Sequence, residues 1–255
     1  MKKLFFIASM ITLLIGSNLN IKNIIGEKTY KTYINLLKPL EAKEDLKEKL
    51  IYLKNNGLLK LFFDKPQIIH PTFILKNNNP ILETKILYKT LHGLGYYYFY
   101  PVNITKNTTY SVTLEMKSAH YIDPVLFIDK ISKYGCNVIN LDKHENYVYT
   151  VECQNAFLPT QQITNEKQRF INANGVYWLA PNGFRNVLIY TSRLDRWYPY
   201  ITFYDKNLNI LNIISKNEIT RTLYIQIPQE CEYIKITDNF SKENFKRGIY
   251  VKGIQ

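Results

Sequence analysis

Two cysteines at matching positions of a predicted β-hairpin constrain the fold more than any other feature of this sequence. The β-rich runs 136–142 and 147–153 flank a short polar segment, which is the pattern of two antiparallel strands joined by a tight loop. Each run carries a cysteine at its outer end. A turn centred between His144 and Glu145 sets these two cysteines directly opposite each other.

The N-terminus indicates where the chain is sent. Lys2 and Lys3 precede an apolar stretch, residues 4–15, and a small pair follows it, so residues 1–17 have the pattern of a secretory signal peptide. The apolar stretch is short for a permanent transmembrane helix. Ile15 is bulky for a position just before the cleavage point, so an uncleaved leader that gives peripheral membrane contact is the alternative. The sequence predicts a periplasmic protein.

Export changes the interpretation of the cysteines. In an oxidising compartment, thiols at opposed strand positions join, because Cα atoms ~4.5 to 5.5 Å apart lie within the span of a disulfide. We therefore predict a disulfide between Cys136 and Cys153, with two buried reduced thiols as the alternative. Cys231 is left over, and we expect a half-buried thiol and not a nucleophile, because no histidine lies near it in sequence.

The charge of the chain suggests an anionic partner. It has 33 Lys and Arg residues against 21 Asp and Glu, a formal net charge of +12. The lysines are spread along the chain without a block of like charges, which weakens the suggestion. We expect no nucleic acid as partner of an exported protein. Peptidoglycan, other saccharides and phospholipid head groups remain.

Residues 18–57 are expected to form a helical N-terminal segment. Leu46, Leu50 and Leu53 recur at helical spacing among charged residues, and Gly57 stands where a helix C-terminus favours glycine. Such a stripe is typical of a face that packs on the rest of a fold.

An internal repeat follows the helical segment. Residues 90–100 align with 130–140 at an offset of 40 residues, with a glycine shared at the same place. Both repeats contain a predicted helix that starts alike, with Asn79 before Pro80 in the first and Asp123 before Pro124 in the second. Each half therefore reads as strand, helix, strand.

Two such halves in tandem predict a ferredoxin-like βαββαβ domain over residues 58–153. The β-rich runs 72–76 and 112–116 supply the first strand of each half. The hairpin arm 147–153 is then an added strand.

Beyond a polar linker at 154–169, the texture changes to short strands only, so residues 170–255 predict an all-β sandwich and the chain as a whole an α+β fold. The closing pattern, "YIKITDN" and then "RGIYVKGI" after a polar loop, resembles the last strands of galactose-binding-like jelly rolls, the family of many carbohydrate-binding modules. This resemblance implies glycan binding. The strand-forming runs are 175–180, 186–192, 200–206, 210–215, 221–228, 233–239 and 247–254.

The sandwich also contains the best candidate for a binding site. Consecutive antiparallel strands bring alternate loops to one end, so loops 192–199, 215–220 and 239–246 should cluster there. Flat aromatic rings and directional polar groups are what a saccharide or a peptide needs. The alternative is that the tryptophan closes the core and that Asp195 and Arg196 form a surface pair. The candidate ligand-binding residues are Arg193, Asp195, Arg196, Trp197 and Tyr198.

Motifs for chemistry are lacking. The four histidines, His70, His92, His120 and His144, do not pair at metal-ligand spacing, so we expect no metal and no cofactor. No nucleophile elbow or phosphate-binding loop is present. Two distant carboxylates could still form a glycosidase pair. Its candidates are Asp195, Asp205, Asp238 and Glu243.

These observations favour an exported, non-enzymatic binding or scaffold protein of a bacterial cell envelope, which engages an envelope protein assembly or a glycan. The tyrosine-rich run 96–101, read as an exposed strand, and the N-terminal helices favour protein assembly. The sandwich and the loop around Trp197 favour glycan. The alternative is a hydrolase acting on cell-wall glycan.

Overall fold

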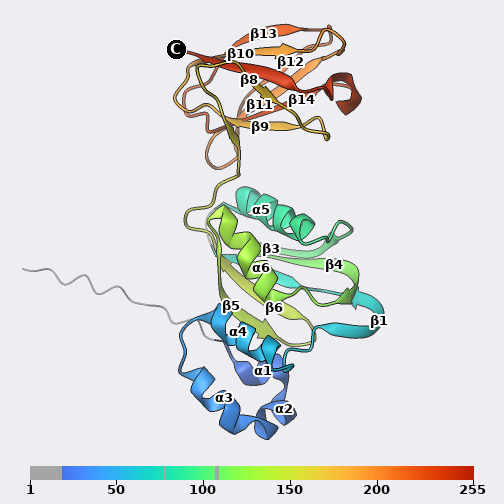
Figure 1. Ribbon diagram of the computed structural model, residues 1–255, viewed down its shortest axis with the longest axis vertical. Coiled ribbons are helices and arrows are strands. Elements are labelled where there is room, and N and C mark those ends of the chain that lie inside the picture. Colours follow the sequence, from blue (N-terminus) through green and yellow to red (C-terminus); the bar gives the residue numbers. More distant parts are fainter. Residues whose placement is uncertain (1–18, 77–78, 107–108) are drawn as a thin grey trace, which may run out of the picture. The chain divides into compact units, whose positions relative to one another are not determined.

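The computed structural model describes residues 19–76, 79–106 and 109–255 (Figure 1). The predicted signal peptide lies outside these residues. The described chain is α+β, with mixed and antiparallel sheets, and none of its helices is long and apolar enough to cross a membrane. Its described residues divide into two compact units: residues 19–76, 89–106 and 109–154 in the first, and residues 79–88 and 155–255 in the second.

Four helices precede the first sheet. Helix α4 shows why this segment is helical: the Asp45 carboxylate accepts the Glu48 backbone N–H at the N-terminus, and the predicted leucine stripe is buried. Lys54 of α4 pairs with Asp123 at 2.5 Å, which ties the helix to the N-terminus of α6 (Pro124–Ile131). The helices are α1 (Ile21–Ile25), α2 (Glu27–Thr32), α3 (Ile34–Glu41) and α4 (Leu46–Asn55).

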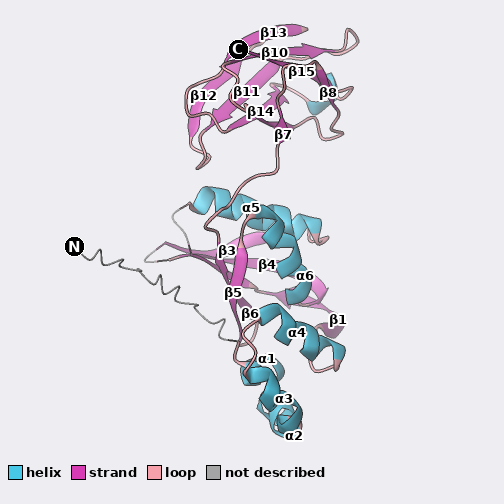
Figure 2. Cartoon of the chain, turned by 60° about the vertical axis from the view of Figure 1, so that its left-hand side comes forward, coloured by secondary structure: helices cyan, strands magenta, loops and turns pink. Residues whose placement is uncertain are grey.

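The first unit is built around a mixed sheet. Strands β1 and β2 pair one after the other with one edge of β4, and β3 pairs with the other edge of β4. Strand β6 pairs with β2, and β5 with β6. Helix α6 lies along this sheet (Figures 1 and 2). The α6 N-terminus has the predicted cap, because Asp123 accepts the N–H groups of Val125 and Leu126. The strands are β1 (Phe62–Ile69), β2 (Thr72–Lys76), β3 (Tyr100–Lys106), β4 (Tyr110–His120), β5 (Asn137–Lys143) and β6 (Tyr147–Glu152), and helix α5 (Pro80–Gly93) joins β2 to β3.

The repeat is visible in the backbone. Gly95 follows α5 and Gly135 follows α6, and both have positive φ angles, +94° and +75°. Other residues rarely adopt these angles, which explains why glycine is shared at this position.

Strand β6 lies between β2 and β5 and runs parallel to β2. The sequence had indicated this arm only as an addition to the sheet, whereas the structure inserts it. Its side chains explain the place: the ring of Tyr149 is fully buried, with its centroid 5.2 Å from that of Phe73 and 4.9 Å from that of Phe127. An edge position would leave this ring without one of those neighbours.

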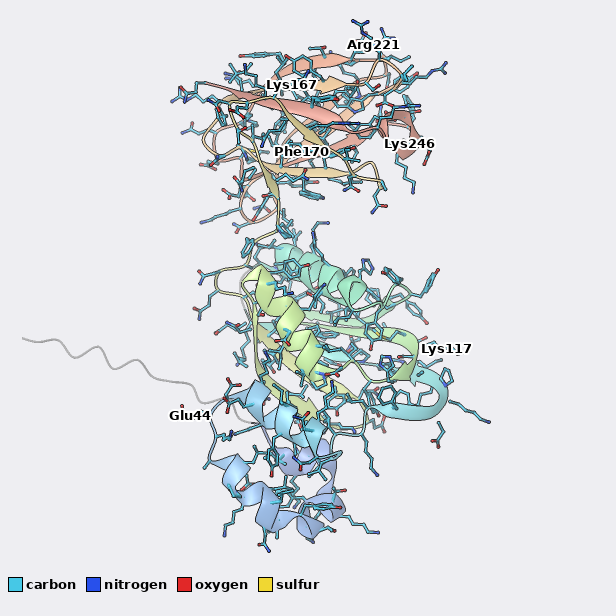
Figure 3. All side chains as sticks on the ribbon, viewed as in Figure 1. Glu44, Lys117, Lys167, Phe170, Arg221 and Lys246 are labelled. Atoms are coloured by element: carbon cyan, nitrogen blue, oxygen red, sulfur yellow. A yellow bond between two sulfur atoms is a disulfide. The ribbon has the colours of Figure 1, made fainter. Side chains whose placement is uncertain are left out.

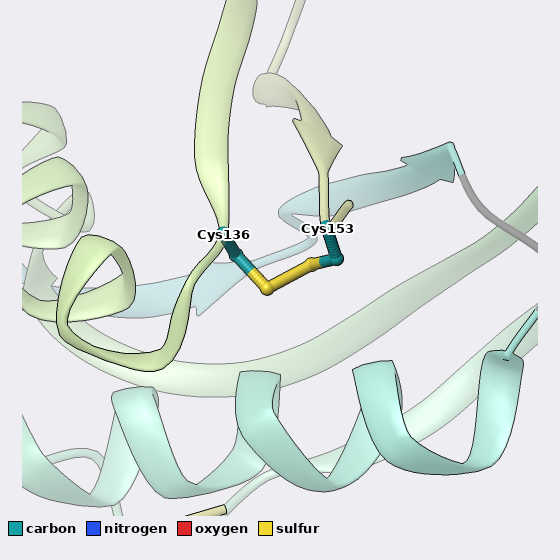
Figure 4. The surroundings of a disulfide bond; sticks show 2 residues. All are labelled: Cys136 and Cys153. Carbon is teal, nitrogen blue, oxygen red and sulfur yellow. A yellow bond between two sulfur atoms is a disulfide. The ribbon is translucent and has the colours of Figure 1, made fainter. Parts of the chain in front are cut away.

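The predicted disulfide between Cys136 and Cys153 is present, with the two Cα atoms 4.1 Å apart (Figure 4). The register near the turn differs from the prediction, because Lys143 pairs with Tyr147 and the loop is centred on Glu145. A β-bulge at residue 139 shifts the pairing back by one position. The bulge therefore restores the opposition of the two cysteines.

Removing this disulfide should destabilise the protein. The Cys136→Ala/Cys153→Ala variant should lose about 3 kcal/mol of unfolding free energy in urea, because the cross-link lowers the conformational entropy of the unfolded chain by closing a loop with a sequence separation of 17. Cys231→Ala is the control and should stay within about 1 kcal/mol of wild type. Non-reducing peptide mapping that links either cysteine to Cys231 would contradict the prediction.

The second unit contains a β-sandwich of a four-stranded sheet, β13-β10-β15-β8, and a five-stranded sheet, β12-β11-β14-β9-β7. Two of its strands fall wholly or partly in the segment predicted as a linker, which Ile163 explains, since this side chain is fully buried in the sandwich core. The strands are β7 (Gln161–Gln162), β8 (Gln168–Phe170), β9 (Tyr177–Ala180), β10 (Asn186–Thr191), β11 (Pro199–Tyr204), β12 (Ile210–Ser215), β13 (Thr222–Gln226), β14 (Tyr233–Asp238) and β15 (Ile249–Ile254).

Helix α5 holds a buried carboxyl group. Glu83 is 1% exposed, and neither of its carboxyl oxygens has a hydrogen-bond partner among the described residues. Burial raises the pKa of Glu83 to about 7. Ionisation of this group therefore opposes folding.

The stability of the protein should reflect this group. In the unfolded chain Glu83 ionises near its ordinary pKa of 4.5, whereas in the folded protein it stays neutral up to a pH of about 7. The free energy of unfolding should therefore be highest below pH 4.5 and should fall as the pH rises to about 7. The loss should be on the order of 2 kcal/mol. Glu83→Gln should remove it, making the variant more stable than wild type at pH 8 in urea titrations. An equal pH dependence of the two proteins would refute the assignment.

Candidate functional site

The structure brings the three predicted loops of the sandwich together at one end. Three backbone hydrogen bonds join them: Arg196 N–H donates to the Asn244 carbonyl at 2.8 Å, Thr220 N–H to the Trp197 carbonyl at 2.9 Å, and Asn239 N–H to the Tyr198 carbonyl at 2.8 Å. Short loops between antiparallel strands explain this arrangement.

Trp197 belongs to the core of the sandwich. Its side chain is fully buried, its ring stacks on Phe245 with centroids 5.9 Å apart, and its Nε1–H donates to the Thr237 carbonyl at 2.8 Å. A ring enclosed in this way offers no face to a ligand. The structure therefore corrects the expectation that Trp197 stacks on a saccharide or peptide, in favour of the alternative that it closes the core.

Asp195 is also structural. It is 3% exposed, and its Oδ1 accepts a hydrogen bond from Arg247 Nη1 at 2.7 Å. The alternative had paired Asp195 with the neighbouring Arg196 at the surface, whereas the structure pairs it with Arg247. Of the five predicted site residues, Arg193 and Arg196 are exposed and Tyr198 is half-buried.

The surface left at this end is a small aromatic and polar patch. The ring of Tyr198 meets that of Phe240 edge to face at 4.8 Å, and Phe240 is 64% exposed. Asn239 Nδ2 donates to Asn217 Oδ1 at 2.6 Å beside them. Phe240 was not among the residues predicted from the sequence. A large apolar residue among the polar residues of loop 239–246 could have indicated it.

The carboxylates proposed for a glycosidase pair all have structural partners. Asp238 accepts the backbone N–H groups of Tyr198, Phe240 and Ser241. Asp205 accepts those of Asn207 and Asn209, and the Asn209 side-chain amide lowers the pKa of Asp205. Glu243 pairs with Lys246 at 2.5 Å. Within the described residues, no group of histidine, cysteine and acidic side chains could hold a metal ion.

A second and more apolar surface lies in the first unit, at the tyrosine-rich run. The segment is anchored on both sides of Tyr98: the Tyr96 hydroxyl lies 3.0 Å from His120 Nδ1, and the ring of Phe99 lies 5.4 Å from that of His92. Burial raises the pKa of Tyr96 to about 12. Tyr98 has no such anchor and is 93% exposed. The predicted exposure of this run is therefore present, mostly just before β3 begins.

This segment forms one wall of a groove with a volume of about 470 Å³. The other wall is residues 115–117 of β4, and Ile68 of β1 also lines the groove. Tyr97, Tyr100 and Ile68 are 66%, 56% and 58% exposed, which is unusual for neighbouring apolar side chains. The groove therefore differs from an ordinary polar surface.

A hydrogen-bonded network borders the groove. The Tyr100 hydroxyl donates to Glu115 Oε1, and His70 Nε2 lies 3.0 Å from Glu115 Oε2. The hydrogen bond from Tyr100, followed by that from His70, lowers the pKa of Glu115. Both carboxylate oxygens are thus occupied by the protein itself.

Comparison with known proteins assigns the chain to no family. No family model matches the chain, and no curated protein or solved structure does. The two surfaces differ in kind: the sandwich patch joins one aromatic pair to polar side chains, whereas the groove is lined mainly by aromatic and apolar side chains.

The burial of Trp197 predicts a stability effect. Trp197→Ala should lower the free energy of unfolding by about 3 to 5 kcal/mol, because it leaves a cavity in the core and an unpaired Thr237 carbonyl. The matched control Tyr198→Ala, on the half-buried neighbour, should cost less than half as much. Urea denaturation followed by circular dichroism measures both. Equal losses would contradict the assignment of Trp197 to the core.

Proposed function

We propose that the protein is an exported, non-enzymatic binding or scaffold component of a bacterial cell envelope, and that it holds a partner protein in the groove beside the tyrosine-rich run. The observation that carries this proposal is the exposure of Tyr97, Tyr98 and Tyr100 next to Ile68. Large apolar patches of this kind mark protein interaction sites, and tyrosine is enriched at their energetic centres.

The compartment follows from two observations. The disulfide indicates an oxidising, extracytoplasmic environment. The sequence of residues 1–17 supports export to the periplasm through a signal peptide. Within this proposal, the mixed sheet is a ferredoxin-like βαββαβ arrangement enlarged by β6.

Glycan binding by the sandwich is a second candidate function. Its support is the exposed Phe240 with the half-buried Tyr198, beside Arg196 and two asparagine side chains, groups that can stack on a saccharide ring and bond its hydroxyls. The resemblance of the last strands to carbohydrate-binding jelly rolls favours the same function. A glycan hydrolase has less support, because each candidate carboxylate already has a structural partner.

Substitution of the exposed tyrosine separates the two functions. Tyr98→Ala should weaken retention of an envelope protein by about 5- to 150-fold, the effect of removing an aromatic hot spot worth ~1 to 3 kcal/mol, without lowering the melting temperature. Quantitative mass spectrometry of pull-downs from intact envelopes measures this.

The matched variant is Phe240→Ala, which removes the exposed aromatic ring of the sandwich. It should leave the protein partner bound. Loss of binding to purified peptidoglycan in Phe240→Ala, together with unchanged recovery of every protein by Tyr98→Ala, would replace the proposed function with glycan binding.

A further inference from the structure

Strand β4 has an edge beside the groove that no other described strand pairs with. Its residues 110–115 pair with β3 on one side, whereas Met116, Lys117, Ser118 and His120 at its end pair, among the described strands, only with β1 on the other side. Leu114 N–H donates to the Pro71 carbonyl at 3.0 Å, on the side of β1 and β2. Because backbone groups alternate in direction along a regular strand and the register is constant from Leu114 to Ser118, the N–H and C=O groups of Lys117 point to the opposite side. Ala119 is the next residue of the same parity.

The tyrosine-rich segment leaves this edge open. Continued pairing in the register of Tyr100 with Glu115 would place Tyr98 beside Lys117, but β3 begins only at Tyr100. Residues 96–99 approach this end of β4 through a side chain, since the Tyr96 hydroxyl lies 3.0 Å from Nδ1 of His120, the last residue of β4, and the Phe99 ring lies beside that of His92. The groove between them is lined by residues 97–100 on one side and by residues 115–117 of β4 on the other.

The charge that remains free in the groove is positive. Lys117 is exposed at the side of the β1–β4 pair (Figure 3), and its ammonium group forms no ion pair within the described part of the chain. Glu115 is occupied by Tyr100 and His70. With a net charge of +12, the chain as a whole also attracts acidic partners.

We propose that an extended polypeptide segment of the partner protein adds to the outer edge of β4 as a new strand. Its backbone pairs with Lys117 and Ala119, its apolar side chains at every second position lie against Tyr97–Tyr100 and Ile68, and an acidic side chain faces Lys117. Main-chain hydrogen bonds supply affinity in this mode, and alternate side chains supply specificity. This inference rests on the proposed function and names its partner chemistry.

The test uses a displayed library of random nine-residue peptides, selected on the folded full-length protein. Enriched peptides should show apolar residues at every second position with an Asp or Glu between them. Hydrogen exchange of the Lys117 and Ala119 amides should slow at least ~10-fold when the best peptide saturates the protein. Enrichment of no peptide, of peptides without alternation, or binding without this protection would overturn the proposal.

Two substitutions separate backbone pairing from side-chain contact. Ala119→Pro removes the N–H at the second proposed pairing position, an exposed edge position where strands tolerate proline, and should weaken the best peptide at least 10-fold. Lys117→Glu should weaken it by a similar factor, whereas Lys252→Glu, an exposed strand lysine of the sandwich, should not. Equal binding by wild type and both groove variants would overturn the inference.

A third measurement does not depend on the folding of any variant. The same peptide with N-methyl groups on the backbone nitrogens that face β4 keeps its side chains, but it cannot pair as a strand and should bind at least 10-fold more weakly. If the envelope partner requires Tyr98 but is retained by a folded Ala119→Pro protein, strand addition fails while the proposed function stands. If nothing requires Tyr98, the proposed function itself fails. Sedimentation that shows a concentration-dependent dimer lost in Ala119→Pro would instead assign the edge to a second copy of the chain.

Discussion

The burial of Tyr149 between Phe73 and Phe127 is the contact on which the first unit depends. It draws β6 into the middle of the sheet, and β6 brings β5 with it through the hairpin and the Cys136–Cys153 disulfide. The Tyr149 hydroxyl donates to the Ile122 carbonyl at 2.8 Å, so this large ring is buried without an unpaired polar atom. Since β2 is then paired on both sides, the unpaired backbone of the sheet lies at its margins, including the end of β4.

Local signals located most of the elements, but they missed β7, which lies within the predicted linker, and they did not give the order of the strands. The cap of Asp123 before Pro124, the glycines after both helices and the alternating runs of the sandwich are short-range patterns, and the structure has them where the sequence indicated. The insertion of β6 depends on contacts between residues far apart in sequence, such as Tyr149 with Phe73, which periodicity does not contain. The cysteine pairing was predicted although the turn was placed half a residue off, because the bulge at residue 139 compensates for the shift.

The candidate sites show the same limit. Trp197 and Tyr98 both lie in aromatic-rich segments that precede a strand, and the sequence offered both as ligand contacts, with the core as the alternative for Trp197. Their environments are opposite: Trp197 is enclosed by Phe245 and the Thr237 carbonyl, whereas Tyr98 is 93% exposed. What distinguishes them is whether neighbouring elements cover the ring, and Phe245 lies in a short 3-10 helix 48 positions further along the chain than Trp197. Exposure of an aromatic residue is a property of the assembled fold.

An open strand edge is a hazard that proteins usually remove with charge, proline or a covering segment. The edge formed by β3 follows that rule, since it carries Pro101 and is irregular between Pro101 and Asn103. The end of β4 follows it through the charge of Lys117, and residues 96–99 reach it only through the Tyr96 side chain at His120, while Phe99 packs on His92. Side-chain contacts at both ends of this segment thus take the place of backbone pairing. The proposed strand of a partner protein would pair with the backbone that these contacts leave open, beside the exposed tyrosines.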